Sequence, residues 1–369
     1  MSSARWIYLD AGRGLAALVV VHHHLMVFYD REMAALIGDE SLLLRAFRGI
    51  SEWNVTAILF FFFISGWSIS LAVERLGILN GIGPWQLYLL QRARRILPMF
   101  LLSLLWAGGL SWAGERNSID TSFYVLVGNI LFLDTPASLG GLWFPPFAGN
   151  GPLWTLSNEV WYYISLPVFY WAVYSRIANP LVRIDAALLG SFVVGIAAIG
   201  ANAILPNPFF LFATLWPLWI VGYVYGASFG QRPIERRVVF WLSLMALVTW
   251  SMALEIRSDT LRILNDGCIV ALCVVLLVKI VRWQTQLTRL NYIDGVVRLF
   301  GSVGRGSYTI YVLHYPLLLF LASRRAELGG LATSLLGLGM LIASAPYLET
   351  RVYARVNQWF ALNRPRVDA

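Results

Sequence analysis

Stretches of about 20 mainly apolar residues recur along the whole of this 369-residue chain. This is the length at which an α-helix crosses the hydrocarbon layer of a bilayer. Hydrophobic residues make up 58% of the sequence and charged residues 13%, whereas soluble domains have roughly 45–50% and about 25%. The sequence therefore predicts an all-α polytopic membrane protein, and a soluble protein with a very large core is excluded.

Apolar runs that end at glycine, proline or charged residues predict about ten transmembrane helices. They lie near residues 7–28, 55–74, 97–114, 153–175, 186–205, 209–229, 238–255, 265–282, 307–323 and 330–349. A shorter apolar run leads into a segment rich in Gly, Pro and Trp. There we expect a re-entrant or interfacial element near 121–150, because irregular backbone at membrane depth must be covered by protein or line a cavity. We expect one transmembrane domain over 1–369, with 350–369 as a short cytoplasmic tail.

The net charge of +8 has its source in arginines that stand between the apolar runs. Most of them fall in alternate gaps and in the two termini, so the positive-inside rule predicts that both termini are cytoplasmic. This distribution encodes topology, and no nucleic-acid partner is expected. The two cysteines, Cys268 and Cys273, lie in one apolar segment, so neither a disulfide framework nor a thiolate metal site is predicted.

A few ionisable residues stand inside the predicted spans, where a charge costs about 2.5–3.5 kcal/mol near the bilayer centre. They are Asp10, Arg13, His24, Glu159 and His314. Such residues in membrane proteins commonly serve function. They are therefore the first candidates for a site.

The stretch RGLAALVVVHHHL holds two of these residues, Arg13 and His24. Eleven residues make about three helical turns, so the two share a helix face with a rise of about 16 Å between them. His22 and His23 point away from that face and are expected to be packing or interfacial residues. Asp10, one turn before Arg13, is placed to pair with it. No metal is expected, because consecutive histidines on a helix diverge.

Five stretches in order resemble the membrane acyltransferase 3 family. YLDAGRGLAALVVVHHHL is similar to its opening helix, whose motif is an arginine, ten residues and a histidine. The other four are FFFISGW (61–67), QRARRILP (91–98), GPLWTLSNEVWYY (151–163) and SYTIYVLHYP (307–316). The resemblance covers residues 8 to 316. Gln91, Asn158 and Val160 depart from common family residues without affecting the match.

The resemblance implies a membrane O-acyltransferase in the bacterial inner membrane. Its donor would be cytoplasmic acetyl-CoA or another short acyl-CoA, and its acceptor a hydroxyl of an extracytoplasmic or lipid-linked glycan. The sequence has no counterpart of the extracytoplasmic esterase-like domain that some members carry. A stand-alone form must deliver the acyl group directly or through a separate partner, so glycan-assembly proteins are candidate partners.

Attack of a hydroxyl on the donor's thioester needs a general base whose pKa lies near the working pH, and imidazole has such a pKa. We expect His24 to be that base, with a transient acyl-histidine as a variant of the role. Arg13, paired through Asp10, would orient the donor or catalytic groups, or complete a structural ion pair. A pore lined by the face that carries Arg13 and His24 would let the donor's extended arm reach from the cytoplasm toward the acceptor.

Arginines before the third predicted span suit the phosphates of the donor, because guanidinium groups bind phosphate oxygens in a fork. Arg92 and Arg95 share a helix face, whereas Arg94 points elsewhere and ranks below them. The alternative is that these residues only set topology.

Substrate contacts are expected from two further segments. Glu159 would bind sugar hydroxyls or polarise a base, unless it pairs with an arginine; Trp154 would stack on a sugar or anchor an interface. The ninth predicted span aligns Ser307, Tyr311 and His314 on one helix face. His314 is either functional or a hydrogen-bonded packing residue. The expected substrate-binding residues are Glu159, Trp154, Tyr163, His314, Ser307 and Tyr311.

Two other functions remain open at this stage. A transporter or flippase for a lipid-linked or small substrate would also keep charges inside the membrane, but it needs no cytoplasmic phosphate site. A non-catalytic subunit of a glycan-assembly complex would tolerate substitution at His24 and Arg13 without loss of activity.

Overall fold

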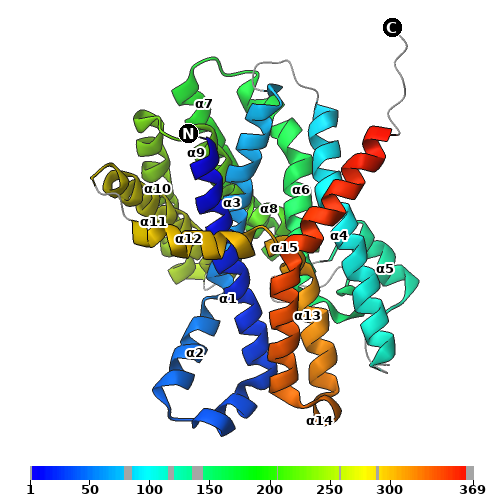
Figure 1. Ribbon diagram of the computed structural model, residues 1–369. Helices are drawn as coiled ribbons and strands as arrows, with labels where there is room; N and C mark the ends of the chain where they lie inside the picture. The colour runs from blue at the N-terminus through cyan, green and yellow to red at the C-terminus, as the bar shows by residue number, and fades with distance from the viewer. Residues whose placement is uncertain are drawn as a thin grey trace.

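The computed structural model describes residues 2–78, 85–114, 120–134, 144–205, 207–256, 259–287 and 291–362, and regular structure in these ranges is helical. The helices are α1 (Ser2–Ile37), α2 (Leu42–Glu52), α3 (Asn54–Arg75), α4 (Trp85–Ala113), α5 (Phe123–Ile130), α6 (Trp154–Phe169), α7 (Pro180–Ile204), α8 (Leu211–Thr214), α9 (Trp216–Ala227), α10 (Arg232–Ile256), α11 (Asp259–Leu287), α12 (Asn291–Gly304), α13 (Ser307–Ser323), α14 (Arg325–Leu328) and α15 (Gly330–Leu362). α1 begins and α15 ends at the same end of the bundle, and α2 and α14 lie at the opposite end (Figure 1).

Seven of the described helices are long and apolar enough to cross a membrane: α1, α3, α4, α7, α10, α11 and α15. The remaining three predicted spans coincide with shorter elements, namely α6 with the π-helical turn that follows it, α8 with α9, and α13. The prediction of an all-α multi-pass membrane protein is therefore confirmed. α15 continues to Leu362, past the predicted end of the last span, and residues 363–369 of the predicted tail lie outside the described residues.

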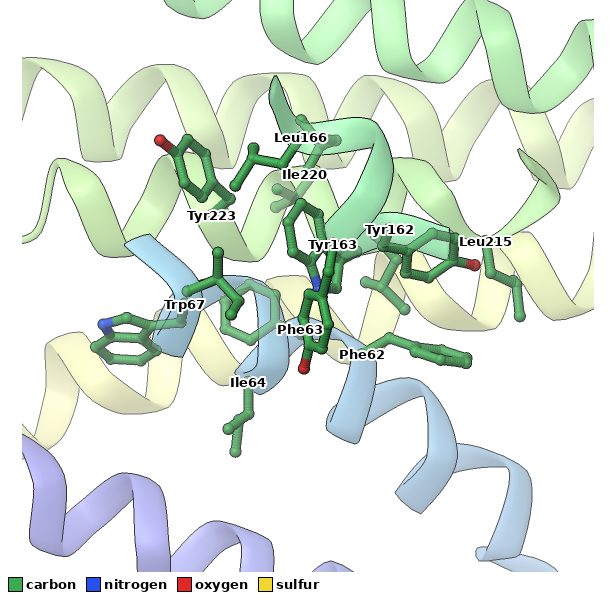
Figure 2. Close-up of a cluster of buried hydrophobic side chains, with 14 of the residues drawn as sticks. Phe62, Phe63, Ile64, Trp67, Tyr162, Tyr163, Leu166, Leu215, Ile220 and Tyr223 are labelled. Carbon is green, nitrogen blue, oxygen red and sulfur yellow. The ribbon is translucent and has the colours of Figure 1, made fainter. Parts of the chain in front are cut away.

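α3 and α9 are packed backbone against backbone in the interior of the bundle. A Cβ atom added at Gly66 would lie 2.0 Å from the Trp219 carbonyl oxygen, and one added at Gly222 would lie 2.0 Å from the Phe63 carbonyl oxygen. Small residues at such positions let membrane helices approach closely. Figure 2 shows the aromatic core around this contact, to which α3 contributes Phe63, α6 contributes Tyr163 and α9 contributes Tyr223.

A second close contact fixes α1 against α12. A Cβ atom at Gly304 would lie 1.7 Å from the Asp10 carbonyl oxygen, and one at Gly14 would lie 2.1 Å from the Phe300 carbonyl oxygen. Both contacts flank Arg13 on α1. The turn of α1 that carries the intramembrane arginine is therefore held in place by backbone packing.

The segment that precedes α6 is irregular, as the sequence predicted for an element near 121–150, although residues 135–143 lie outside the described part. It contains α5 and two 3₁₀ turns, Phe147–Gly149 and Gly151–Leu153, and Ala148 has a left-handed backbone with φ of 51°. Such backbone for a residue with a Cβ is uncommon and costs energy. Surrounding contacts must therefore hold the segment in place.

One of these contacts supplies a hydrogen bond to a backbone carbonyl of α13 that lacks its helical partner. Pro316 has no N–H, so the carbonyl oxygen of Val312 loses its helical partner. The side-chain amide of Asn150, which is fully buried, donates to that oxygen at 3.2 Å. The irregular segment is in this way fastened to the helix that carries His314.

Candidate functional site

A cavity of about 110 Å³ lies among α1, α3, α4, α6 and α13. Its charged lining consists of three arginines and one glutamate, and most of its other polar lining consists of hydroxyl groups. The charged residues are Arg13, Arg92, Arg95 and Glu159; the hydroxyl-bearing residues are Ser65, Ser68, Thr155, Tyr163, Ser307, Tyr308 and Tyr311. The walls thus bring together residues from all five stretches that the sequence singled out.

Arg13 enters this cavity from α1. Its guanidinium forms an ion pair with Asp10 at 3.0 Å and donates a hydrogen bond to the hydroxyl of Ser68 on α3. Ser68 in turn donates to the Ile64 carbonyl oxygen at 2.7 Å. These contacts tie α1 to α3 and leave the arginine facing the cavity.

Arg92 and Arg95, one turn apart on α4, both line the cavity. Within the described ranges neither forms an ion pair or a hydrogen bond, and the Nε atom of Arg92, like that of Arg94, is buried without a partner. Arg94 lies elsewhere, with its guanidinium carbon 4.0 Å from the centre of the Phe360 ring. The helical period therefore separates the three arginines into two cavity residues and one that stacks on α15.

Glu159 supplies the single carboxylate of the lining. Its Oε1 atom accepts hydrogen bonds from the hydroxyls of Ser65 and Tyr163, and the indole of Trp219 donates to Ser65 at 3.2 Å. The carboxylate is thus bound by hydroxyls rather than by an arginine. The residues of the lining carry an excess of positive charge, which favours an anion. Part of that charge is offset from outside the lining, by Asp10, which pairs with Arg13, and by Glu349 of α15, which acts electrostatically on Arg95 and Arg13.

α13 continues from the cavity toward the opposite end of the bundle. The hydroxyl of Tyr308 donates to the Ile96 carbonyl oxygen at 2.9 Å, and that of Tyr311 donates to the Pro152 carbonyl oxygen at 3.0 Å. Tyr311 also shares a 2.6 Å hydrogen bond with Thr155. The two tyrosines therefore join α13 to α4 and to the start of α6.

His24 lies beyond this cavity and does not line it. Its Nδ1 atom is 3.0 Å from Nε2 of His314. Between Arg13 and His24 along α1, Ala16 and Val20 form a buried cluster with Ala57 of α3, and Phe61 and Tyr311 pack against this cluster. The cavity that Arg13 lines therefore does not extend to His24, and the structure does not show the continuous pore that their shared helix face suggested.

The neighbouring histidines anchor α2. His22 bonds to the Phe47 carbonyl oxygen at 2.9 Å, and His23 bonds to the Ser51 carbonyl oxygen at 3.0 Å. The three consecutive histidines thus point to three different partners. Over the described residues, no three or more His, Cys, Asp or Glu side chains come together as a group that could hold a metal ion.

Of the remaining sequence candidates, Ser307 and Tyr163 line the cavity, whereas Trp154 packs edge to face against Phe62 with ring centres 6.4 Å apart. Sequence reasoning did not single out Ser65 and Ser68. Their spacing of three residues in an apolar span, FFFISGWS, is the signal that would have found them, because it places both hydroxyls on one helix face.

The fold and the site define a multi-pass membrane protein with an arginine-lined cavity and a histidine pair. The family model described as "Acyltransferase domain" matches residues 6–348. The chain therefore belongs to the membrane acyltransferase 3 family and is a membrane acyltransferase, which requires an acyl donor. Searches of curated proteins and of solved structures gave no significant match.

Proposed function

We propose that this acyltransferase moves an acetyl group from cytoplasmic acetyl-CoA to a hydroxyl of an extracytoplasmic or lipid-linked glycan in the bacterial inner membrane. The observation that carries the proposal is the cavity that Arg92 and Arg95 both line without forming an ion pair or a hydrogen bond with any described residue. The Nε atom of Arg92 is buried without a partner, and a buried charge that is not paired is costly. An anionic ligand would remove that cost.

The donor fits this requirement through its phosphates. Coenzyme A carries a pyrophosphate and a ribose phosphate, and arginine binds phosphate oxygens through two parallel hydrogen bonds. The cavity is smaller than the whole donor, so the nucleotide would lie at its mouth and the narrow pantetheine arm would extend inward. Positive-inside topology puts the end of the bundle where α1 begins in the cytoplasm, where the donor is made.

His24 is the proposed general base. The acceptor oxygen attacks the thioester carbonyl carbon while the imidazole takes the hydroxyl proton. The tetrahedral intermediate then expels the thiolate of coenzyme A by breaking the C–S bond, and the imidazolium returns the proton to the sulfur. The rise of about 16 Å from Arg13 to His24 is of the same order as the extended pantetheine arm.

Acetyl-CoA binding to the purified protein in lipid nanodiscs, measured by calorimetry, tests the donor site. A hydrogen bond to a charged group contributes about 1.5–3 kcal/mol, so Arg92→Gln and Arg95→Gln should each weaken binding at least tenfold. Arg94→Gln, which removes a guanidinium stacked on Phe360, should have a smaller effect. Arg351→Gln removes a charge stacked on Tyr347 at the same end of the bundle and is the matched control. Absence of binding by the wild type, or equal losses in all four variants, would refute the donor site.

Acetyl transfer from labelled acetyl-CoA to membrane glycan tests the base. His24→Ala should abolish transfer while acetyl-CoA binding persists, because His24 lies outside the arginine cavity. Unchanged transfer would overturn the assignment. A transporter would move its substrate without binding acetyl-CoA, so the binding experiment also separates that alternative.

A further inference from the structure

A chain of hydrogen bonds runs from the backbone of α13 through two histidines. Nδ1 of His314 lies 2.8 Å from the carbonyl oxygen of Tyr311 and 3.1 Å from that of Ile310. Nε2 of the same ring lies 3.0 Å from Nδ1 of His24. The His24 ring is thus connected through the His314 ring to two backbone carbonyl oxygens, which can only accept hydrogen bonds.

The carbonyl oxygens at the start of this chain determine which ring nitrogen donates each hydrogen bond and which accepts it. A carbonyl oxygen only accepts hydrogen bonds, so Nδ1 of His314 must carry the proton. In a neutral imidazole the other nitrogen is then an acceptor, which makes Nε2 of His314 the acceptor and Nδ1–H of His24 the donor. The lone pair of His24 is therefore left on its Nε2 atom. The backbone of Val20, one turn earlier on α1, provides a further acceptor for the His24 ring.

We propose that His314 is a positioning residue that holds His24 in the tautomer whose Nε2 atom acts as the base. This inference rests on the proposed function, in which His24 takes the acceptor proton. His314 itself touches neither substrate in this arrangement. It acts through the hydrogen bond that it accepts, as the orienting third group does in other base-assisted acyl transfers.

The surroundings of His314 make it suited to this task. The residue is fully buried, and the rings of Tyr311 and Tyr315 lie with centres 5.9 and 6.3 Å from its own. The buried amide of Asn150 holds the next turn of α13, where Pro316 leaves a carbonyl without a partner. His24, by contrast, is only partly buried, so the base keeps a face open to an acceptor.

The same hydrogen bond serves both protonation states of the base. When Nε2 of His24 takes the acceptor proton, Nδ1–H still donates to His314, so no ring has to turn during the reaction. A neutral acceptor stabilises the imidazolium less than a carboxylate would. His24 therefore stays neutral at rest and ready to accept a proton, and it returns that proton readily to the departing thiolate.

Three substitutions of His314 separate positioning from packing. His314→Gln places an amide oxygen near the site of Nε2 and can still accept from His24. His314→Asn retains a donor near the site of Nδ1, toward the Tyr311 carbonyl, but is too short to reach His24. His314→Leu removes both hydrogen bonds and keeps an apolar volume.

Kinetics of acetyl transfer in membrane vesicles give the first readout. General-base catalysis contributes typically 10²–10⁴-fold, so His314→Asn and His314→Leu should lower kcat at least 100-fold. His314→Gln should stay within about tenfold of the wild type, with KM for acetyl-CoA unchanged in all three. Wild-type kcat in the Asn and Leu variants would overturn the proposal.

Nitrogen NMR on protein with ¹⁵N-labelled histidine gives a second readout that needs no activity. The chain has four histidines, and the signal of His24 is identified by its loss in His24→Ala. We expect Nε2 of His24 to be unprotonated in the wild type and in His314→Gln, and to become mixed in His314→Leu. A proton on Nε2 in the wild type would overturn the proposal. If the wild type transferred no acetyl group, the proposed function would fail while this measurement still decided the tautomer.

Discussion

The contact between α3 and α9 gives the sharpest test of how the cavity is supported. In Gly222→Ala the new Cβ atom would lie 2.0 Å from the carbonyl oxygen of Phe63. An ordinary contact between carbon and a carbonyl oxygen is about 3.3 Å or more, so the two helices must separate by about 1.3 Å. Overpacking of this kind costs about 1–3 kcal/mol, whereas alanine in a helix gains up to about 1 kcal/mol over glycine. We expect a net loss of about 2 kcal/mol, since the clash is with backbone.

Thermal unfolding of the purified protein in detergent, followed by circular dichroism, measures this loss. Gly190→Ala in α7 is the matched control, because a Cβ atom there meets nothing within 4 Å, and it should melt at or above the wild-type temperature. Gly222→Ala should melt several degrees lower and bind acetyl-CoA more weakly, because α3 carries Ser65 and Ser68 of the cavity. Equal melting temperatures for the two variants would refute the reasoning.

Two further predictions concern the irregular segment before α6. Asn150→Ala should cost about 1–3 kcal/mol, because it leaves the Val312 carbonyl without a hydrogen bond. Pro316→Ala restores a backbone N–H that can bond to the same carbonyl. In thermal unfolding the double variant should therefore lose less stability than the summed losses of the two single variants, and strict additivity would count against the contact. Burial raises the pKa of Asp134 to about 6, above the value near 4 of an unfolded chain, so its contribution to stability falls as pH rises from about 4 to 6. Asp134→Asn should remove that fall in melting curves recorded between pH 4.5 and 7.5, and an unchanged pH dependence would contradict it.

The positions of the helices were predictable because they depend on local properties. Each of the ten predicted spans coincides with helical structure, although the span near 209–229 is divided between α8 and α9. An apolar run long enough to cross a bilayer must satisfy its own backbone hydrogen bonds. The shorter helices α6 and α13 contain Pro167 and Pro316. Which helices pack against each other was not predictable, because a run of apolar residues does not indicate which of its faces meets which partner helix.

The same division holds within the site. Helical periodicity alone was enough to expect the Asp10–Arg13 pair and to separate Arg94 from its neighbours on α4. It was not enough to join His24 to His314, which lie 290 residues apart in the chain. That contact depends on α1 packing beside α13, which is a property of the whole fold.

The separation between the arginine cavity and the histidine pair bears on how acyl transfer proceeds. Phe61 and Tyr311 line the arginine cavity and pack against the buried cluster of Ala16, Val20 and Ala57, whose α1 members lie between Arg13 and His24. Tyr311 is held there by Thr155 and the Pro152 carbonyl. On the proposed function, the thioester meets the base only after these rings move. A donor held behind an aromatic barrier is kept from water, because closing an active site excludes solvent from reactive groups. The hydrogen bonds that hold Tyr311 therefore connect the start of α6, which follows the irregular segment, to the rings whose movement would bring the donor to the base.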